Sequence, residues 1–415
     1  MSNLAYDQIV RDRPSSMSGV MIFLGIVLII CDIFIASRFY SFTFGESSRI
    51  IFMSIALAII ACFLLYSFLE QDLVPVILTV CLLGIFVAYM YLFSAKSGRD
   101  ININAFAQIY GILSFAVFYQ MARHRIIHQF LNIMMIIISI YLVIYCILAT
   151  LYYMGIIDSL ESDDVYTVLY DKERGNRLFL AGGLTTFVLA YAATRLTDRI
   201  QIAHLLLLAL AFTASILSWS RVFIVVNVIL VLIYFTLRSV RPIQIISFCA
   251  FLSICAYLIY GILAPPFNPF DFSQTDTSTL YRRQEFILLS EYIRNNPIFG
   301  VGLYDSEAGL YYYLGRSLIF PSDLGIVGIW FMFGLVGVFI FGLLPAYLCF
   351  YPRIDRRRTG ATVADVRTCT FVGCSIGISA ASTMNMFNGA DSLMFGMLLG
   401  LTVFSVLSGR RRPGF

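Results

Sequence analysis

The residues best suited to chemistry are arginines in the one long polar segment of an otherwise apolar chain. This segment runs from Pro265 to Phe320 and carries four of them: Arg282, Arg283, Arg294 and Arg316. A further arginine, Arg221, follows Ser220 at the start of an apolar stretch. A guanidinium donates two parallel hydrogen bonds to phosphate oxygens, which makes these residues candidate phosphate ligands. Arg221 alone can equally place its charge at a membrane interface, and a pair in a polar loop can simply be solvated.

A carboxylate is the candidate for a general base, because no histidine lies near this polar segment. The three histidines are His124, His128 and His204. Asp323, in the sequence PSDLG where the chain becomes apolar again, could accept a proton if it were buried away from solvent. It could equally cap the N-terminus of the following helix. Weaker candidates for the base are Glu285, Asp305 and Glu307.

Aromatic and acidic residues offer two further, weaker signals. The tyrosines after the arginines are Tyr304, Tyr311, Tyr312 and Tyr313. They could stack on sugar rings, and they could equally anchor the chain at a membrane interface. Asp32 falls within an apolar stretch, where an unpaired carboxylate is unfavourable. We expect it to pair with an arginine of a loop rather than to act in catalysis.

The arginines of the polar segment fall on a predicted helix that begins near Leu280. The run DFSQTDTST can cap this helix and Pro297 ends it. One face carries Arg282, Phe286, Leu289 and Ile293. A second, polar stripe carries Arg283, Ser290 and Arg294. This pattern predicts an amphipathic helix on the outer membrane surface, followed by a tight turn at Gly300 and Gly302.

Composition identifies the class of protein that must position these residues. The 415 residues are 60% hydrophobic and only 13% charged, whereas soluble domains carry about 25% charged residues. Apolar stretches long enough to cross a bilayer lie at 18–36, 50–68, 73–94, 103–121, 127–153, 177–194, 202–217, 222–237, 243–263, 324–350, 368–387 and 392–408. We therefore expect an all-α polytopic membrane protein with about 12 transmembrane helices, forming one membrane domain over residues 1–415.

The basic residues predict the orientation of this domain. With the N-terminus in the cytoplasm, sixteen of the 28 lysines and arginines fall on the inner side. The short RIDRRR and GRRR segments are both among them, so both termini are expected inside. The two long external loops are then an acidic one at 155–175 and the arginine-bearing one at 265–320. The histidines fall at or near the cytoplasmic face.

Several classes of partner are disfavoured. The nine cysteines all lie in apolar stretches, so a disulfide framework is not expected. The net charge of +4 is explained by cytoplasmic arginines and requires no nucleic acid. No carboxylate-rich metal signature is present in the external loops, so we expect neither a metal nor another cofactor.

The order of these motifs resembles the superfamily of O-antigen polymerases (Wzy-type) and ligases. That resemblance rests on the Ser220-Arg221 pair opening a span, the Arg282-Arg283 helix, the PIFGVG segment from Pro297, and the span GIVGIWFMFGLVG from Gly325. It covers roughly residues 219–351; the first half of the chain matches only in being multi-span. Each motif is weak alone, and their order and topology together are fairly specific.

The resemblance implies a GT-C-like helical fold and a periplasmic active site in a bacterial inner membrane. A growing chain on undecaprenyl diphosphate would be the donor and a hydroxyl of a second lipid-linked repeat unit the acceptor, by inverting transfer. Arg221 and either Arg282 or Arg283 would bind the diphosphate, with Asp323 as base. The implied substrate contacts further include Ser220, Arg294, Arg316, Tyr304, Tyr311 and Tyr312. A chain-length regulator protein is a possible partner, beside the membrane lipids.

Two alternatives stay open. A ligase of the same family would transfer the glycan to lipid A-core, but such ligases are expected to have a histidine soon after the external loop, and this chain has none there. A transporter or flippase of lipid-linked saccharides belongs to a different class. Transporters tend to place polar groups at the bilayer midplane in repeated, broken helices. Here the arginines cluster outside and no clear internal repeat is present.

Overall fold

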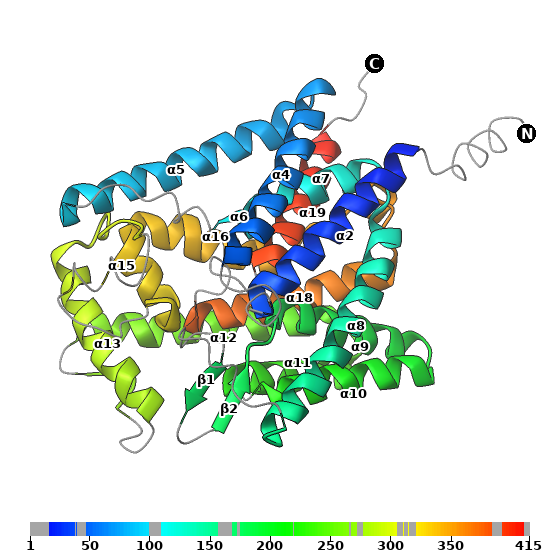
Figure 1. The fold of residues 1–415 in the computed structure, drawn as a ribbon. Coiled ribbons are helices and arrows are strands. Elements are labelled where there is room, and N and C mark those ends of the chain that lie inside the picture. Colours follow the sequence, from blue (N-terminus) through cyan, green and yellow to red (C-terminus); the bar gives the residue numbers. More distant parts are fainter. Residues whose placement is uncertain are drawn as a thin grey trace, which may run out of the picture.

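The protein is a bundle of helices, most of them apolar (Figure 1). The structure is a computed structural model. It describes residues 16–37, 39, 47–98, 109–156, 168–171, 175–218, 220–264, 267–271, 277–304, 310, 314, 321–383 and 392–410.

The helices follow the predicted apolar stretches closely. The N-terminal half contains α2 (Ser16–Ser37), α4 (Ser47–Leu69), α5 (Leu73–Ser97), α6 (Tyr110–Leu113), α7 (Phe115–Arg123), α8 (Ile127–Tyr153), α9 (Gly182–Asp198) and α10 (Ile202–Leu217). The C-terminal half contains α11 (Arg221–Leu237), α12 (Val240–Leu263), α13 (Thr277–Asn295), η2 (Pro321–Leu324), α15 (Ile326–Gly337), η3 (Val338–Leu343), α16 (Leu344–Phe350), α17 (Arg356–Thr359), α18 (Val363–Ser382) and α19 (Ser392–Arg410).

Length and apolarity mark this as a multi-pass membrane protein. In the described part of the chain, six helical segments are long and apolar enough to cross a membrane: Met17–Ser37, Arg49–Leu69, Leu73–Ser97, Ile127–Tyr153, Val240–Leu263 and Ile326–Phe350. Three shorter apolar helices accompany them: Ile202–Leu217, Phe223–Leu237 and Ser392–Ser408. Since many of their large apolar side chains are exposed, they are suited to contact lipid.

The centre of the bundle is formed by helices rich in small and weakly polar residues. α18 packs against α9, α11, α12 and α16, and Figure 1 shows it crossing the middle of the molecule. Gly373 allows α18 to approach the backbone of Cys349 in α16. Thr194 of α9 and Thr368 of α18 share a hydrogen bond of 2.9 Å. Small residues permit such close helix packing inside membranes.

One hairpin departs from the all-α expectation. Strands β1 (Val168–Asp171) and β2 (Gly175–Leu178) pair antiparallel, with Val168 opposite Leu178 and Asp171 opposite Gly175. The hairpin begins in the predicted acidic loop and takes the first residues of the predicted stretch 177–194, so α9 starts only at Gly182. The run VYTVLY is rich in β-branched and aromatic residues that favour strands.

Two ends of the molecule can be distinguished by the polar contacts that they carry. At one end, Arg195 of α9 and His128 of α8 both reach Asp365 of α18. The backbone N–H of Asp355, next to α17, donates to Ser405 of α19 at 2.9 Å. We name this the α17 end. The opposite end carries the hairpin and α13 (Figure 1), and we name it the α13 end.

Candidate functional site

The candidate site is centred on α13, at the end of the molecule that bears its name. This helix begins at Thr277, three residues before the predicted start, and ends at Asn295, two residues before Pro297. Phe286, Leu289 and Ile293 are 2%, 0% and 1% exposed, so the predicted apolar face is confirmed. Ser290 was expected on the polar stripe but is only 3% exposed, because α13 is enclosed by α12, α15 and η2 rather than merely lying on a surface.

Short polar contacts fix α13 against the loop that precedes it. Asn268 is 6% exposed; its amide donates to the carbonyl of Arg283 at 3.2 Å, and its Oδ1 accepts from the N–H of Phe270 at 2.9 Å. The ring of Phe270 then meets Phe286 of α13 edge to face. Arg294 donates to the carbonyl of Ile262 at 3.2 Å. That carbonyl lies in the last turn of α12, so the contact favours helix capping over substrate binding for Arg294.

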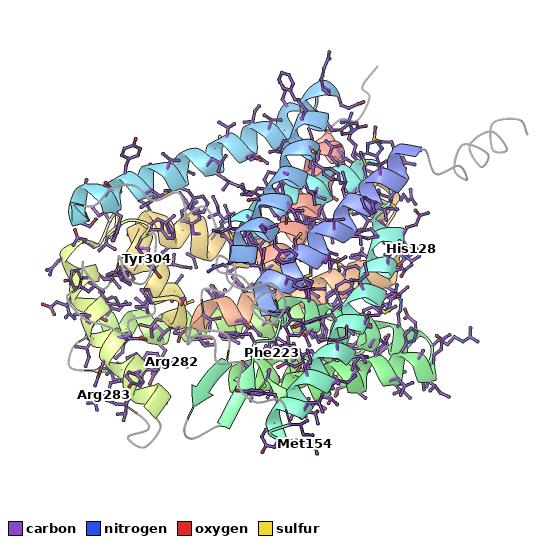
Figure 2. All side chains as sticks on the ribbon, in the orientation of Figure 1. His128, Met154, Phe223, Arg282, Arg283 and Tyr304 are labelled. Carbon is purple, nitrogen blue, oxygen red and sulfur yellow. The ribbon has the colours of Figure 1, made fainter. Side chains whose placement is uncertain are left out.

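The two adjacent arginines of α13 are in different electrostatic states. Arg283 Nε lies 2.6 Å from Asp271 Oδ1 in a half-exposed ion pair. Arg282 makes no ion pair within the described residues, and its Nε is buried without a hydrogen-bond partner there. A buried, unpartnered guanidinium nitrogen is unfavourable unless a ligand completes it. The sequence left the choice between these two residues open; the structure favours Arg282 as the anion ligand. Figure 2 shows both on α13, far from His128.

The segment after α13 inserts beside a break in a membrane helix. Gly334 of α15 has φ 66° and ψ −170° and interrupts the helix. The carbonyls of Phe331 and Met332, before the break, accept from Val301 and Gly302 at 2.8 Å each. The N–H of Leu335, after the break, donates to the carbonyl of Pro297 at 2.8 Å. The inserted segment therefore satisfies backbone groups that a broken helix would leave unpaired in an apolar medium.

Three glycines make this insertion sterically possible. A Cβ on Gly300, whose φ is 65°, would lie 2.5 Å from the backbone nitrogen of Gly334. A Cβ on Gly334 would collide with the carbonyl of Ile298. Gly302, with φ 105°, lies directly against the backbone of Tyr89 and Phe93 in α5. The predicted turn at Gly300 and Gly302 is confirmed, and these glycines also allow the segment to touch two helices.

The predicted second cationic position lies at the start of α11. Arg221 is the first residue of that helix, so the predicted start at the Ser-Arg pair is confirmed, and Ser220 is the N-cap residue. The Ser220 side chain forms no capping hydrogen bond, and its carbonyl accepts from the N–H of Ile224 at 3.0 Å. The side chain of Arg221 lies outside the described part of the structure. Figure 2 labels Phe223, two residues further along α11.

The two described candidates for the general base, Asp323 and Glu285, differ in burial. Asp323 lies in η2, which contacts α13, and it is exposed. The burial that would make it a stronger base is therefore absent. It is not the N-cap of α15 either, because Gly325 holds that position without a side-chain cap. Glu285, on α13 three residues after Arg282, is only 4% exposed. By burial, Glu285 is the better candidate for a base.

Of the tyrosines proposed as sugar-binding residues, only Tyr304 lies in the described part of the structure. Tyr304 is 7% exposed and its ring meets Phe93 of α5 edge to face at 6.5 Å. This favours packing over stacking on a sugar, although Figure 2 places Tyr304 at the same side of the molecule as the arginines. Other residues proposed from the sequence lie outside the described part: Tyr311, Tyr312, Tyr313, Arg316, Asp305 and Glu307.

Two contributors to this end of the molecule are not evident from the sequence. Asp271, which pairs with Arg283, lies in a polar run that predicted only a helix cap. Lys96, at the last turn of α5, donates to Asn296 Oδ1 at 2.9 Å and to the carbonyl of Gly300 at 2.6 Å. Its position at the end of an apolar stretch predicts only a charge at the membrane boundary, because nothing local indicates a contact 200 residues away.

The α17 end holds a denser polar network, in which Asp365 is the centre. Asp365 is fully buried and accepts from Arg195 at 3.0 Å and from the N–H of Thr362 at 2.8 Å; His128 Nδ1 is also 2.8 Å away. Burial alone would raise the pKa of the Asp365 carboxyl, but these hydrogen bonds outweigh it and lower the pKa below the ordinary value. Asp365 is also the third residue of a capping box with Thr362.

The intramembrane acid Asp32 has a tyrosine as one of its partners. Its Oδ1 accepts a hydrogen bond of 2.7 Å from Tyr110 of α6, and both residues are buried. A hydroxyl donor lowers the cost of holding a carboxylate in an apolar region. The expected pairing with an arginine of a loop stays a prediction.

Comparison with known proteins adds no family. No protein-family model matches this chain, and no curated protein is significantly similar to it. Among the described residues, no cluster of three or more histidines, cysteines or carboxylates could hold a metal ion. The arrangement at the α13 end can therefore be interpreted only from its own chemistry. Arg282, which has no ion-pair partner among the described residues, and buried Glu285 lie three residues apart on a helix that packs against a broken membrane span.

Proposed function

We propose that this protein is a polymerase of lipid-linked saccharides. It would join undecaprenyl-diphosphate-linked repeat units into a surface polysaccharide by inverting glycosyl transfer, without a metal. The observation that carries the proposal is Arg282, a partly buried arginine with no ion-pair partner among the described residues. A lipid-linked diphosphate would supply the missing anion.

The proposed setting is a bacterial inner membrane crossed about twelve times, with both termini in the cytoplasm and the α13 end in the periplasm. A GT-C-like architecture belongs to the same proposal. Support comes from the basic residues at the α17 end, such as Arg195 and Arg367, which the positive-inside rule places in the cytoplasm.

In the proposed reaction, a hydroxyl of the acceptor repeat unit attacks the anomeric carbon of the donor. A new carbon–oxygen bond forms as the bond to the diphosphate breaks, and the hydroxyl proton passes to a carboxylate. Glu285 fits this role by its burial, and Asp323 remains the alternative in η2. Arg282 and Arg221 would stabilise the negative charge developing on the departing diphosphate.

The test is reconstitution with purified protein and lipid-linked repeat units in the presence of a chelator. A ladder of longer glycans is the expected product. Arg221→Ala should abolish the ladder while the variant remains folded, and Glu285→Gln should reduce it far more than Asp323→Asn. A full ladder with Arg221→Ala would contradict a shared diphosphate clamp, and the absence of any ladder from the wild-type protein would contradict the polymerase.

The broken helix favours one second candidate, a transporter of lipid-linked saccharides. Transporters use interrupted helices whose unpaired backbone groups bind substrate or ions near the midplane. Here those backbone groups pair with residues 297–302, which leaves fewer of them for a ligand. Movement of a labelled lipid-linked saccharide across vesicles containing the Arg282→Ala protein would support transport over polymerisation.

A further inference from the structure

Lys96 is a charged residue near this site for which the proposed reaction has no role. It is one of two lysines in the chain, the other being Lys172. It lies in the last turn of α5. A lysine at such a place ordinarily extends its ammonium toward water or lipid headgroups. In this structure the ammonium instead bonds to Asn296 Oδ1 at 2.9 Å and to the Gly300 carbonyl at 2.6 Å.

These two acceptors lie on either side of the junction between α13 and the inserted segment. Asn296 immediately follows α13, whose last residue is Asn295. Gly300 lies within the inserted segment, directly before Val301 and Gly302, whose N–H groups donate to the broken helix. Lys96 therefore joins the end of the helix that carries Arg282 to the segment that fixes it in place.

The same face of α5 supports the rest of the insertion. The carbonyl of Tyr89 accepts from the N–H of Leu303 at 3.0 Å, and the Tyr89 hydroxyl donates to the carbonyl of Phe333 at 2.8 Å. Phe93 lies between these contacts and Lys96, against Gly302. One helix thus contacts both the inserted segment and the broken span, and Lys96 supplies its charge-assisted hydrogen bonds, which are stronger than neutral ones.

We propose that Lys96 is a positioning residue that holds α13, and with it Arg282, in the register needed to bind a lipid-linked diphosphate. Its effect on substrate rests on the proposed function; its effect on the inserted segment does not. Lysine suits this role because its compact ammonium can donate to two oxygens that lie close together.

The structural part is tested by amide hydrogen exchange on the purified full-length protein. Lys96→Met keeps the length of the side chain and removes both hydrogen bonds. Exchange of the amides of residues 301–303 should rise about tenfold or more, the effect expected from losing charge-assisted bonds, while α8 should be unaffected. Lys172→Met is the matched control and should leave the exchange unchanged. Unaltered exchange at residues 301–303 in Lys96→Met would overturn the proposal.

A double-mutant cycle separates this contact from a general loss of stability. Asn296→Ala removes one of the two acceptors and should raise the same exchange by a smaller factor. Combined with Lys96→Met, it should add almost nothing, because the bond is already lost. Additive effects would contradict the direct contact. This cycle also remains informative if Lys96→Met folds poorly, since Asn296→Ala and Asn296→Gln can be compared alone.

The functional part uses steady-state kinetics of the glycan ladder. In Lys96→Met, the KM for the lipid-linked donor should rise about tenfold with a much smaller change in kcat, and Lys96→Arg should restore part of the loss. Loss of kcat alone would contradict a positioning role. If the wild-type protein forms no ladder, the proposed function fails, whereas the exchange result still decides whether Lys96 holds the segment.

Discussion

The two ends of this molecule use charge in opposite ways. At the α17 end, buried Asp365 accepts hydrogen bonds from Arg195 and from the N–H of Thr362, and His128 Nδ1 lies 2.8 Å from it. Charged neighbours there also pair with one another: Arg367 Nη1 lies 2.7 Å from Asp198 Oδ1. At the α13 end, Arg282 has a buried Nε without a partner among the described residues. Arg195 Nη1 at the α17 end is likewise buried without a hydrogen-bond partner, so the difference lies in ion pairing: Asp365 balances the charge of Arg195, whereas Arg282 has no ion-pair partner among the described residues.

That difference matters because both ends carry arginines. Counting charges would assign function to either end, and the larger number of basic residues would favour the α17 end. The ion pairs of these residues favour the α13 end instead. Ion pairing also distinguishes the adjacent residues Arg282 and Arg283, because of the two only Arg283 forms an ion pair with a carboxylate, that of Asp271.

The largest expected effect comes from removing the unpaired charge at the α13 end. Arg282→Ala should reduce glycan polymerisation by about a hundredfold to a thousandfold, the range for losing one preorganised donor to a developing negative charge. Thermal unfolding in detergent should be nearly unchanged, because the side chain makes no ion pair in the described structure. A large fall in stability would show that Arg282 is structural and would remove the contrast between the ends.

Removing the central charge of the α17 end should have the converse result. Asp365→Ala leaves Arg195, whose side chain is 14% exposed, without its carboxylate. Breaking such a buried pair costs about 3–5 kcal/mol. The thermal unfolding midpoint should fall strongly, while the activity of the protein that remains folded stays near that of the wild type. Loss of activity without loss of stability would place a functional site at the α17 end.

Gly334→Ala tests the comparison differently, because it should displace the segment inserted beside α15 without removing any charged group. The new Cβ would collide with the carbonyl of Ile298 at a φ of 66°. We expect destabilisation of about 2 kcal/mol, from strain at a positive φ together with displacement of the inserted segment. Gly84→Ala is the control, since a Cβ there meets nothing within 4 Å. Equal stability of both variants would contradict the tight insertion.

Acidic pH should lower the stability of the protein through protonation of Asp365 at the α17 end. The folded-state pKa of Asp365 lies below the ordinary value of 3.8. Its contribution to stability is therefore complete above that ordinary value and is lost as the pH falls from there through the lowered pKa. Unfolding midpoints of the wild type and Asp365→Asn should converge in that acidic range. A constant difference between the two proteins would contradict the assigned shift.

Local patterns were sufficient to predict most of the fold. Apolar runs predicted α8 at Ile127–Tyr153 and α10 at Ile202–Leu217 to the residue, because helix formation in an apolar medium depends on little else. The Arg282 face of α13 was equally readable from its spacing. The hairpin was missed because its strands lie within a charged loop and a predicted span.

The contacts that define the site could not be predicted in the same way. Whether Arg282 or Arg283 is neutralised depends on Asp271, which the loop before α13 brings back to Arg283. The PIFGVG segment indicated a turn, but its pairing with a break at Gly334 requires two elements to meet. The burial of Glu285 and the exposure of Asp323 likewise follow from how α13, α15 and η2 pack.

The most direct test is equilibrium binding of undecaprenyl diphosphate to the purified wild-type protein, Arg282→Ala and Arg283→Ala. If the unpaired guanidinium is the diphosphate ligand, Arg282→Ala should weaken binding at least about tenfold, whereas Arg283→Ala should change it little, because its charge is already balanced. Binding that falls equally in both variants, or more in Arg283→Ala, would contradict the assignment of function to the unpaired charge.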